Sequence, residues 1–366
     1  MTEDKSTRYH RLKRRSEVAS LLWSAVCLFA LLRSGASVTL GNWAQAALPF
    51  WLACGIVVAA LIAATEVIAL PLSWYGFVLE RRYGLARQTA RSWLFDHVKA
   101  MGLGLALAWG GATLVYGAMR VTPDYWWLAA GVTLAIVVTV LATLAPVVLL
   151  PMFFRFTPLE RPALVSRLQA LAARAGTAVI GVYEWALGDK SRRANAALTG
   201  LGMTRRILIS DTMLADYSDE EIEVVLAHEL GHHVHRDIWR GIAFESALMV
   251  LGFAVTHQVL RLAGPLMGLR GIDDLGGAPL LALTAGAVSL VLSPLALALS
   301  RRHERKADRF ALELTSNPAA FISAMRRLGA QNLAEERPSR LVRWLFHSHP
   351  PLDERLAFAK DWKPAG

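Results

Sequence analysis

The sequence predicts an α-helical integral membrane protein of about six transmembrane helices that carries an α+β domain facing the cytosol. The chain of 366 residues is 54% hydrophobic and 19% charged, and its mean hydropathy is +0.38. These values lie well to the apolar side of soluble globular proteins. The apolar residues are also gathered in long runs, and a run of about 20 residues is enough to cross the hydrocarbon layer as a helix.

Six apolar runs give the simplest count of spans. They cover about residues 18–38, 47–78, 100–118, 125–150, 241–260 and 279–299. The first run follows a basic start, so it is open to a second interpretation as the core of a cleaved signal peptide. The second run carries Glu66, and we expect this acid to have a structural role inside the helix bundle.

Along the chain, connections rich in Lys and Arg alternate with connections that carry few or none, which fits the positive-inside rule. The amino terminus, the segment 155–240 and the carboxyl terminus are therefore expected on the cytoplasmic side, and a bacterial inner membrane is the expected location. The net charge of +10 lies in blocks beside the apolar runs, not on one polar face. We therefore expect the lipid bilayer, and no nucleic acid, among the partners.

The spans divide the chain into four segments. These are an amino-terminal membrane domain with four spans (1–155), a first part of a catalytic domain (156–240), a transmembrane hairpin (241–299) and a second part of the catalytic domain (300–366). Between the fourth and fifth spans the pattern predicts a helix over 161–176 and strands over 177–185, 193–198 and 205–211, the last two around a Thr-Gly-Leu-Gly turn. Helices are expected over 300–315, 317–330 and 351–361.

One predicted helix carries the pattern His-Glu-x-x-His at His228, Glu229 and His232. Ser218 and Glu221 form a capping-box pattern that starts this helix. Residues four apart share a helical face, so the two imidazoles can bind one Zn²⁺. Glu229 can then take a proton from a metal-activated water, which is the chemistry of peptide hydrolysis.

Two histidines leave the metal one protein ligand short. His233 and His235 point away from the pair around the helix, whereas Glu304 and Asp308 are four apart on another predicted helix. If the last two spans form an antiparallel hairpin, Glu304 emerges beside the histidine helix. Glu304 can then bind the metal, and Asp308 can orient a ligand imidazole.

These residues carry a resemblance to a known family. The segments HELGHH, SRRHERKAD, RRANAALTGLGMTRRILISDTML and HSHPPLDERLAF, with LERRYGLARQTARSWLFDHVK in the amino-terminal half, are similar to the membrane-bound gluzincin proteases. Within this group the chain resembles the type I CAAX prenyl endopeptidases and, more distantly, the bacterial heat-shock membrane protease HtpX. That branch is usually described with seven spans, one more than the count here.

The resemblance implies a gluzincin-type catalytic domain and one Zn²⁺ per chain. It implies that His228, His232 and Glu304 bind the metal, that Glu229 is the general base and that Asp308 supports a ligand. It further implies that Asn195 and Ala196 border the substrate and that His349 stabilises the oxyanion. Asn195 lies in a predicted strand that could pair with an extended substrate. Arg355 could bind substrate, although pairing with Asp353 or Glu354 is the favoured interpretation.

The sequence therefore predicts an integral-membrane zinc endopeptidase. Its substrate is a peptide or protein, either a lipidated, CAAX-like carboxyl-terminal peptide or a membrane protein under quality control. The alternative is a non-proteolytic membrane scaffold that keeps a structural zinc. The sequence leaves the oligomeric state open.

Overall fold

A computed structural model describes residues 4–200, 205–335 and 337–364 of the chain. Five helices form the amino-terminal half: α1 (Lys5–Arg33), α2 (Ala36–Ala47), α3 (Phe50–Arg82), α4 (Ala90–Val121) and α5 (Trp126–Val148). Two further long helices, α9 (Asp237–Ala263) and α10 (Ala278–Thr315), form a hairpin later in the chain. Within the described residues, six helices are long and apolar enough to cross a membrane, which confirms the predicted number of spans.

The first span differs in its limits from the predicted run. Helix α1 begins at Lys5, inside the basic start of the chain, and ends at Arg33. Gly35 follows with a φ of 73°, a left-handed conformation that glycine adopts without strain. The chain therefore turns there, and the residues after it form α2, a separate helix of 12 residues.

Glu66 on α3 has a partner inside the bundle. Its Oε1 lies 2.8 Å from Nε2 of His97 on α4. An acid in a span is costly unless it is paired. The contact ties α3 to α4 and agrees with the structural role expected from the sequence.

A small mixed sheet lies in the segment between α5 and α9. Its strands β1 (Phe156–Pro158), β2 (Gly181–Trp185), β3 (Ala196–Thr199) and β4 (Arg206–Ser210) are ordered β1-β2-β4-β3. β2 and β4 are parallel, and the two outer pairs are antiparallel. The sequence missed β1, which is only three residues long. The predicted turn between β3 and β4 includes residues 201 and 202, which lie outside the described part of the chain.

Helices cover the sheet and complete this domain. They are α6 (Pro162–Arg174), α7 (Asp211–Asp216), α8 (Asp219–Val234), α11 (Pro318–Gln331), α12 (Arg340–Phe346) and α13 (Leu352–Asp361). Short 3₁₀ turns occur at Leu150–Met152, Pro265–Met267 and Leu275–Gly277. Leu168, Ile207, Leu226 and Phe321 come from different elements and are fully buried in one core. The helices α7 and α12, of six and seven residues, were not predicted.

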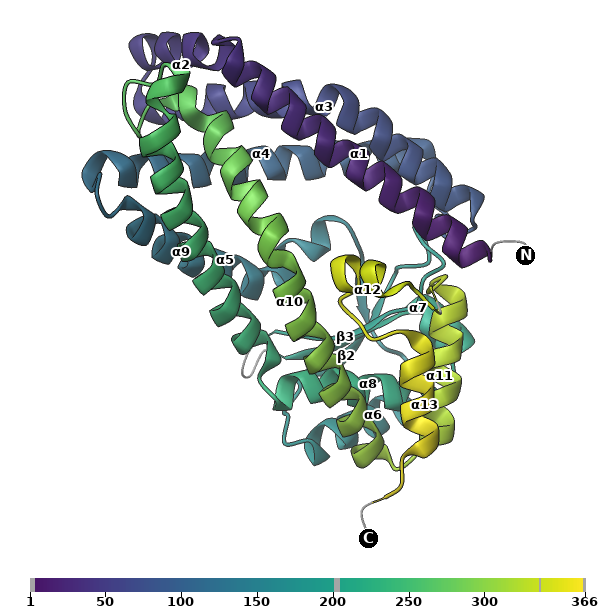
Figure 1. Ribbon diagram of the computed structural model, residues 1–366. Helices are drawn as coiled ribbons and strands as arrows, with labels where there is room; N and C mark the ends of the chain where they lie inside the picture. The colour runs from purple at the N-terminus through teal and green to yellow at the C-terminus, as the bar shows by residue number, and fades with distance from the viewer. Residues whose placement is uncertain (1–3, 201–204, 336, 365–366) are drawn as a thin grey trace.

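Helix α10 joins the membrane part to the domain without a break. It runs from Ala278 to Thr315, so the predicted span at 279–299 and the predicted helix at 300–315 are one helix. Figure 1 shows it descending from the membrane helices to the lower domain. It crosses α8 at Gly231, where an added Cβ would lie 3.0 Å from the Cα of Ala307. The glycine therefore permits the close approach of the two helices that carry the predicted metal ligands.

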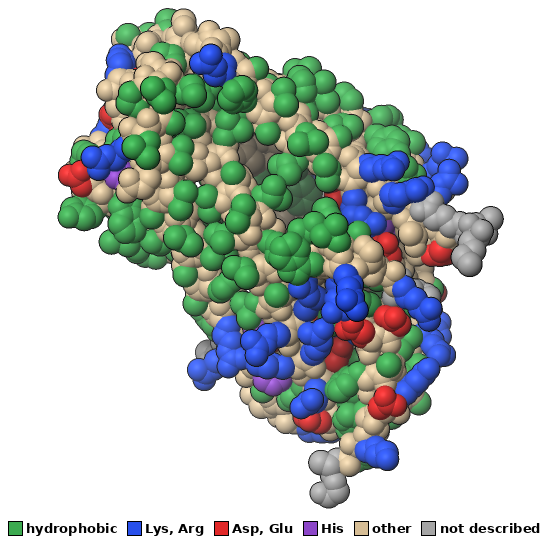
Figure 2. All heavy atoms as spheres, in the orientation of Figure 1, with side chains coloured by type: hydrophobic (Ala, Val, Ile, Leu, Met, Phe, Trp, Pro, Cys, Tyr) green, Lys and Arg blue, Asp and Glu red, His purple; other side chains and the backbone are tan. Residues whose placement is uncertain are grey.

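The amino-terminal helix also touches the domain. His10 Nε2 donates to the carbonyl of Leu333 at 2.8 Å, and Arg14 pairs with buried Glu335 at 2.7 Å. The loop between α3 and α4 forms an isolated β-bridge from Ala86 to Ser191. The basic start, this basic loop and the domain thus lie on the same side of the helix bundle. In Figure 2 the upper part of the face is mainly hydrophobic, charged side chains gather below, and a hollow opens between them.

Candidate active site

Helix α8 presents the His-Glu-x-x-His pattern as the sequence predicted. Ser218 and Glu221 make both hydrogen bonds of a capping box at its start. His228 is buried and His232 is half-buried, and their Nε2 atoms lie 3.3 Å apart. Two imidazole nitrogens that face each other at this distance fit two ligands of one metal ion.

Helix α10 brings Glu304 to the two imidazoles. Its Oε2 lies 3.3 Å from His228 Nε2, and its Oε1 lies 3.4 Å from His232 Nε2. Zn²⁺ bound at about 2.0–2.1 Å to nitrogen and oxygen ligands has tetrahedral edges of about this length. Glu304 Oε2 is buried and makes no hydrogen bond, which is costly for a carboxylate without a cation. His228, His232 and Glu304 are the one group of this kind within the described residues, and they fit a zinc ion.

Each histidine has a carboxylate behind it. His228 Nδ1 lies 2.8 Å from Asp308 Oδ1, and His232 Nδ1 lies 3.1 Å from Asp237 Oδ2. Both acids are buried. Such contacts fix the ring so that Nε2 faces the metal. The sequence analysis found Asp308 but missed Asp237, whose signal is an acid at the start of α9, five residues after His232.

The position of Arg355 differs from the favoured sequence interpretation, which paired it with Asp353 or Glu354. Arg355 pairs with neither acid; its Nε donates to Asp308 at 2.9 Å, and its terminal nitrogen donates to the other oxygen of the same carboxylate. Residues one or two apart on a helix do not face each other, so α13 directs Arg355 away from its acidic neighbours and toward α10. Arg355 holds Asp308, which in turn contacts His228.

Burial and neighbouring charges together set the pKa values of the α8 side chains. Burial raises the pKa of Glu229 above its usual range, while the neighbouring imidazoles oppose the increase. Burial alone would lower the pKa of His228, but the close Asp308 and Glu304 carboxylates outweigh burial and raise the pKa to about 10. A carboxyl whose pKa is raised holds a proton more readily, as an acid–base group needs.

The remaining predicted residues lie around one cavity of about 380 Å³. It is lined by Ala196 at the start of β3 and Asn195 just before it, by His228 and Glu229 of α8, and by His349 of the loop before α13. His349 Nε2 lies 3.2 Å from Glu304 Oε1, and the side chain is 60% exposed. The structure thus gathers the residues that the sequence predicted to contact metal or substrate, with Arg355 at the same cavity wall.

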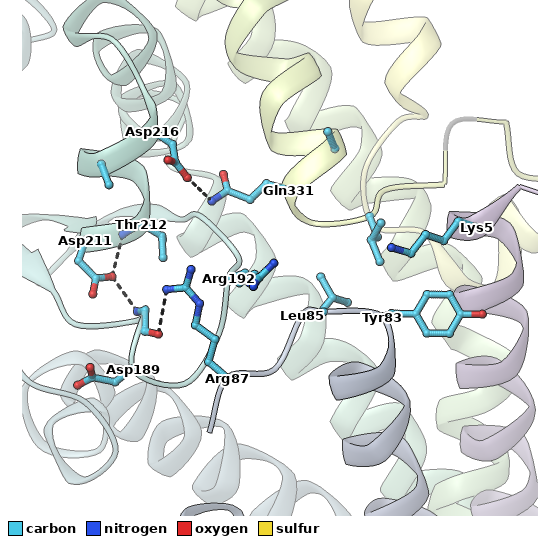
Figure 3. A pocket seen from close by; sticks show the side chains of 15 residues that line it. Lys5, Tyr83, Leu85, Arg87, Asp189, Arg192, Asp211, Thr212, Asp216 and Gln331 are labelled. Carbon is cyan, nitrogen blue, oxygen red and sulfur yellow. Dashed lines mark hydrogen bonds between the residues drawn. The ribbon is translucent and has the colours of Figure 1, made fainter. Parts of the chain in front are cut away.

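The two histidines at the carboxyl end of α8, His233 and the C-cap residue His235, do not join the group. His235 packs edge-on against Phe310, and His233 lies outside the three-residue cluster of ligand atoms found in the described part of the chain. A larger cavity of about 750 Å³ lies apart from the metal group. Figure 3 shows that Lys5, Arg87 and Arg192 share its walls with two acids of α7 and with Asp189 of the loop between β2 and β3. This mixed charge does not select one ligand.

The comparisons with known proteins agree with this geometry. Residues 158–363 match the model of peptidase family M48, and residues 2–155 match the model described as CAAX prenyl protease N-terminal, five membrane helices. In this chain that second segment contains four candidate spans and the short α2.

Individual relatives cover most of the chain. An uncharacterized metalloprotease, YhfN, of Bacillus subtilis is 32% identical over 91% of this chain and 79% of its own length. CAAX prenyl protease 1 of Saccharomyces cerevisiae is 29% identical over 80% and 68%. The crystal structure of S. mikatae Ste24p has the same fold, with a TM-score of 0.85 at 24% identity over 98% of this chain and 88% of that one.

Fold and site together define a multi-pass integral-membrane metalloprotease. The chain belongs to peptidase family M48, and it is of the CAAX prenyl protease type.

Proposed function

We propose that the protein is a zinc-dependent endopeptidase in which His228, His232 and Glu304 hold one Zn²⁺ and Glu229 is the general base. The observation that carries the proposal is the cluster of ligand atoms beside a carboxyl whose pKa is raised. The two imidazole Nε2 atoms lie 3.3 Å apart, Glu304 Oε2 lies 3.3 Å from that of His228, and Glu304 Oε1 lies 3.4 Å from that of His232. Membership in a peptidase family favours this function over a scaffold with a structural zinc.

Each residue has a defined task in this mechanism. Zinc, when bound, lowers the pKa of a water and polarises the substrate carbonyl. Glu229, next to the ligand His228 on α8, takes the water proton and passes it to the leaving amine. Asp308 and Asp237 hold the imidazole rings by their Nδ1 atoms, and Arg355 holds Asp308. His349, 3.2 Å from Glu304, donates to the oxyanion, a contribution of about 3 kcal/mol in comparable sites.

The substrate backbone is proposed to lie along β3. Because the sheet order ends at β3, this strand has an open edge, and Asn195 and Ala196 lie at the cavity that holds Glu229. An extended peptide can add to such an edge as a further strand. The exposed Asn195 side chain is then free to contact the peptide beside the scissile bond.

The site and both termini are proposed to face the cytoplasm, in a bacterial inner membrane. Contacts of the basic start and the basic α3–α4 loop with the catalytic domain support this orientation, because positive loops stay inside. The match to a YhfN protein of Bacillus subtilis supports a bacterial source.

Removal of the metal tests the zinc proposal. Treating the detergent-purified protein with 1,10-phenanthroline is expected to lower cleavage of unfolded β-casein by about 100-fold or more, because no other group activates water. One equivalent of Zn²⁺ should restore both the metal content, measured by atomic absorption, and the rate. Full activity of a protein shown to contain no metal would overturn the proposal.

For the substrate, we propose lipidated carboxyl-terminal peptides rather than damaged membrane proteins. The membrane domain matches that of the CAAX prenyl proteases, and the hollow in Figure 2 is bordered by hydrophobic side chains that could accommodate a lipid. A farnesylated peptide is expected to show kcat/KM at least about tenfold above its unmodified form, since burial of even two methylene groups has this effect. Equal rates for the two peptides would favour the quality-control substrates.

A further inference from the structure

Just before β3, the backbone that would continue its open edge is blocked at Ala194 by a side chain that the sequence analysis did not single out. Asn332 caps the carboxyl end of α11, and its amide reaches the backbone of Ala194. Its Oδ1 accepts from the Ala194 N–H at 3.2 Å, and its Nδ2 donates to the Ala194 carbonyl at 3.4 Å. The side chain thus makes the two hydrogen bonds that a neighbouring strand would make.

Successive residues of a strand direct their backbone N–H and carbonyl groups to opposite edges, and this pattern shows which groups remain for a substrate. Asn195 directs its backbone N–H and carbonyl toward β4. Its N–H donates to Ser210 Oγ and its carbonyl accepts from the Ser210 N–H, each at 2.9 Å. In an antiparallel pair, adjacent residues face opposite sides. Ala194 and Ala196 therefore direct their N–H and carbonyl groups to the open edge, and Asn332 uses those of Ala194.

Contacts from the membrane helices hold this cap in place. Leu333, next to Asn332, has a φ of 51°, and its carbonyl accepts from His10 of α1 at 2.8 Å. On the other side of Ala194, Arg193 donates to Glu80 of α3 at 3.0 Å and to Tyr9 of α1 at 3.1 Å. Both sides of the Asn332–Ala194 contact are therefore fixed.

We propose that Asn332 is a specificity-determining residue that limits substrate pairing to β3 itself, from Ala196 toward Thr199, and excludes it from the backbone of Ala194 just before the strand. This inference rests on the proposed function. Ala194 and Ala196 line the same cavity as His228 and Glu229, so the cap lies beside the reacting atoms. Consequently, the substrate backbone is held by β pairing on one side of the scissile bond and meets the Asn332 cap on the other.

The test uses peptides built around one sequence that the wild type cleaves in β-casein. The peptide is lengthened by one to four residues at either end, and kcat/KM is measured for wild type, Asn332→Ala and the control Gln331→Ala. Gln331 is the adjacent amide, but its side chain bonds with Asp216 at the larger cavity (Figure 3) and with Tyr217, instead of with Ala194.

Wild type and Gln331→Ala are expected to gain rate from added residues at one end only. Asn332→Ala should also gain about fivefold at the other end, because the Ala194 groups become available for hydrogen bonds. N-methylation of the peptide amide that faces Ala194 should abolish this gain in Asn332→Ala and leave wild type unchanged. The same length profile in wild type and Asn332→Ala would overturn the inference.

A measurement on wild type alone keeps the inference testable if Asn332→Ala does not fold. Scanning N-methylation along the peptide should lower kcat/KM at the residue that faces Ala196 and not two residues further toward Asn332. A loss of rate at both positions would contradict the proposal that Asn332 blocks pairing at Ala194. If wild type cleaves no peptide at all, the proposed function fails instead, so the two failures are distinguishable.

Discussion

Glu229→Gln is expected to lower the rate of peptide cleavage by about 10²–10⁴-fold, the range that a positioned general base contributes. Glutamine keeps the size of the side chain but cannot take the proton of the attacking water. Zinc content should stay at one per chain, because Glu229 lies outside the cluster of ligand atoms formed by His228, His232 and Glu304. Cleavage is measured by mass spectrometry of β-casein fragments, and zinc by atomic absorption on the same sample.

The zinc measurement makes this variant decisive. Glu245→Gln is a matched control, since it changes an acid on α9 that lies outside the cavity of Glu229. It should retain wild-type activity. A Glu229→Gln protein that retains stoichiometric zinc and cleaves at the wild-type rate would exclude Glu229 as the base.

Arg355→Ala is expected to destabilise the protein by about 3–5 kcal/mol, because it leaves the buried Asp308 carboxylate without its cation. Without Arg355, Asp308 also holds His228 less firmly, and the affinity for zinc should fall by about 10–100-fold. Thermal unfolding in detergent measures the first effect, and titration with a competing chelator measures the second.

A second arginine provides the comparison for this prediction. Arg305 pairs with Glu354, and both side chains are about half exposed, at 50% and 41%. A surface pair of this kind contributes at most about 1 kcal/mol. Arg305→Ala should therefore change neither zinc affinity nor the unfolding temperature appreciably. Equal losses of stability in the two variants would contradict the role given to Arg355.

Patterns that repeat along one element were predictable from the sequence. The spans follow from the length of apolar runs, and the face shared by His228 and His232 follows from four-residue spacing on a capped helix. Glu304 is 72 positions after His232, yet the hairpin made by the last two spans was enough to place it beside the histidines. The structure brings these three residues together as that argument predicted.

Contacts that depend on the angle between packed elements could not be predicted in the same way. Asp237 reaches His232 because α9 begins at Asp237, directly after α8, and the chain changes direction at its N-cap residue Arg236, which has a φ of 55°. The pairing of Arg355 with Asp308 depends on how α13 packs against α10. Asn332 reaches Ala194 across 138 residues, and no local pattern marks that contact.

Because α10 is unbroken, the metal ligand Glu304 lies on the same rigid helix as the last membrane span. Pro294 lies inside this helix, and Glu304 lies ten residues further on, a distance of about 15 Å at the helical rise. A bend of 10° at the proline would move Glu304 by about 2.6 Å, whereas metal ligands tolerate displacements of about 0.5 Å. The tight crossing of α10 over α8 at Gly231 must therefore absorb the movements that the bilayer imposes on the span. The accuracy of the metal site is consequently set as much by helix packing at the membrane boundary as by the ligands themselves.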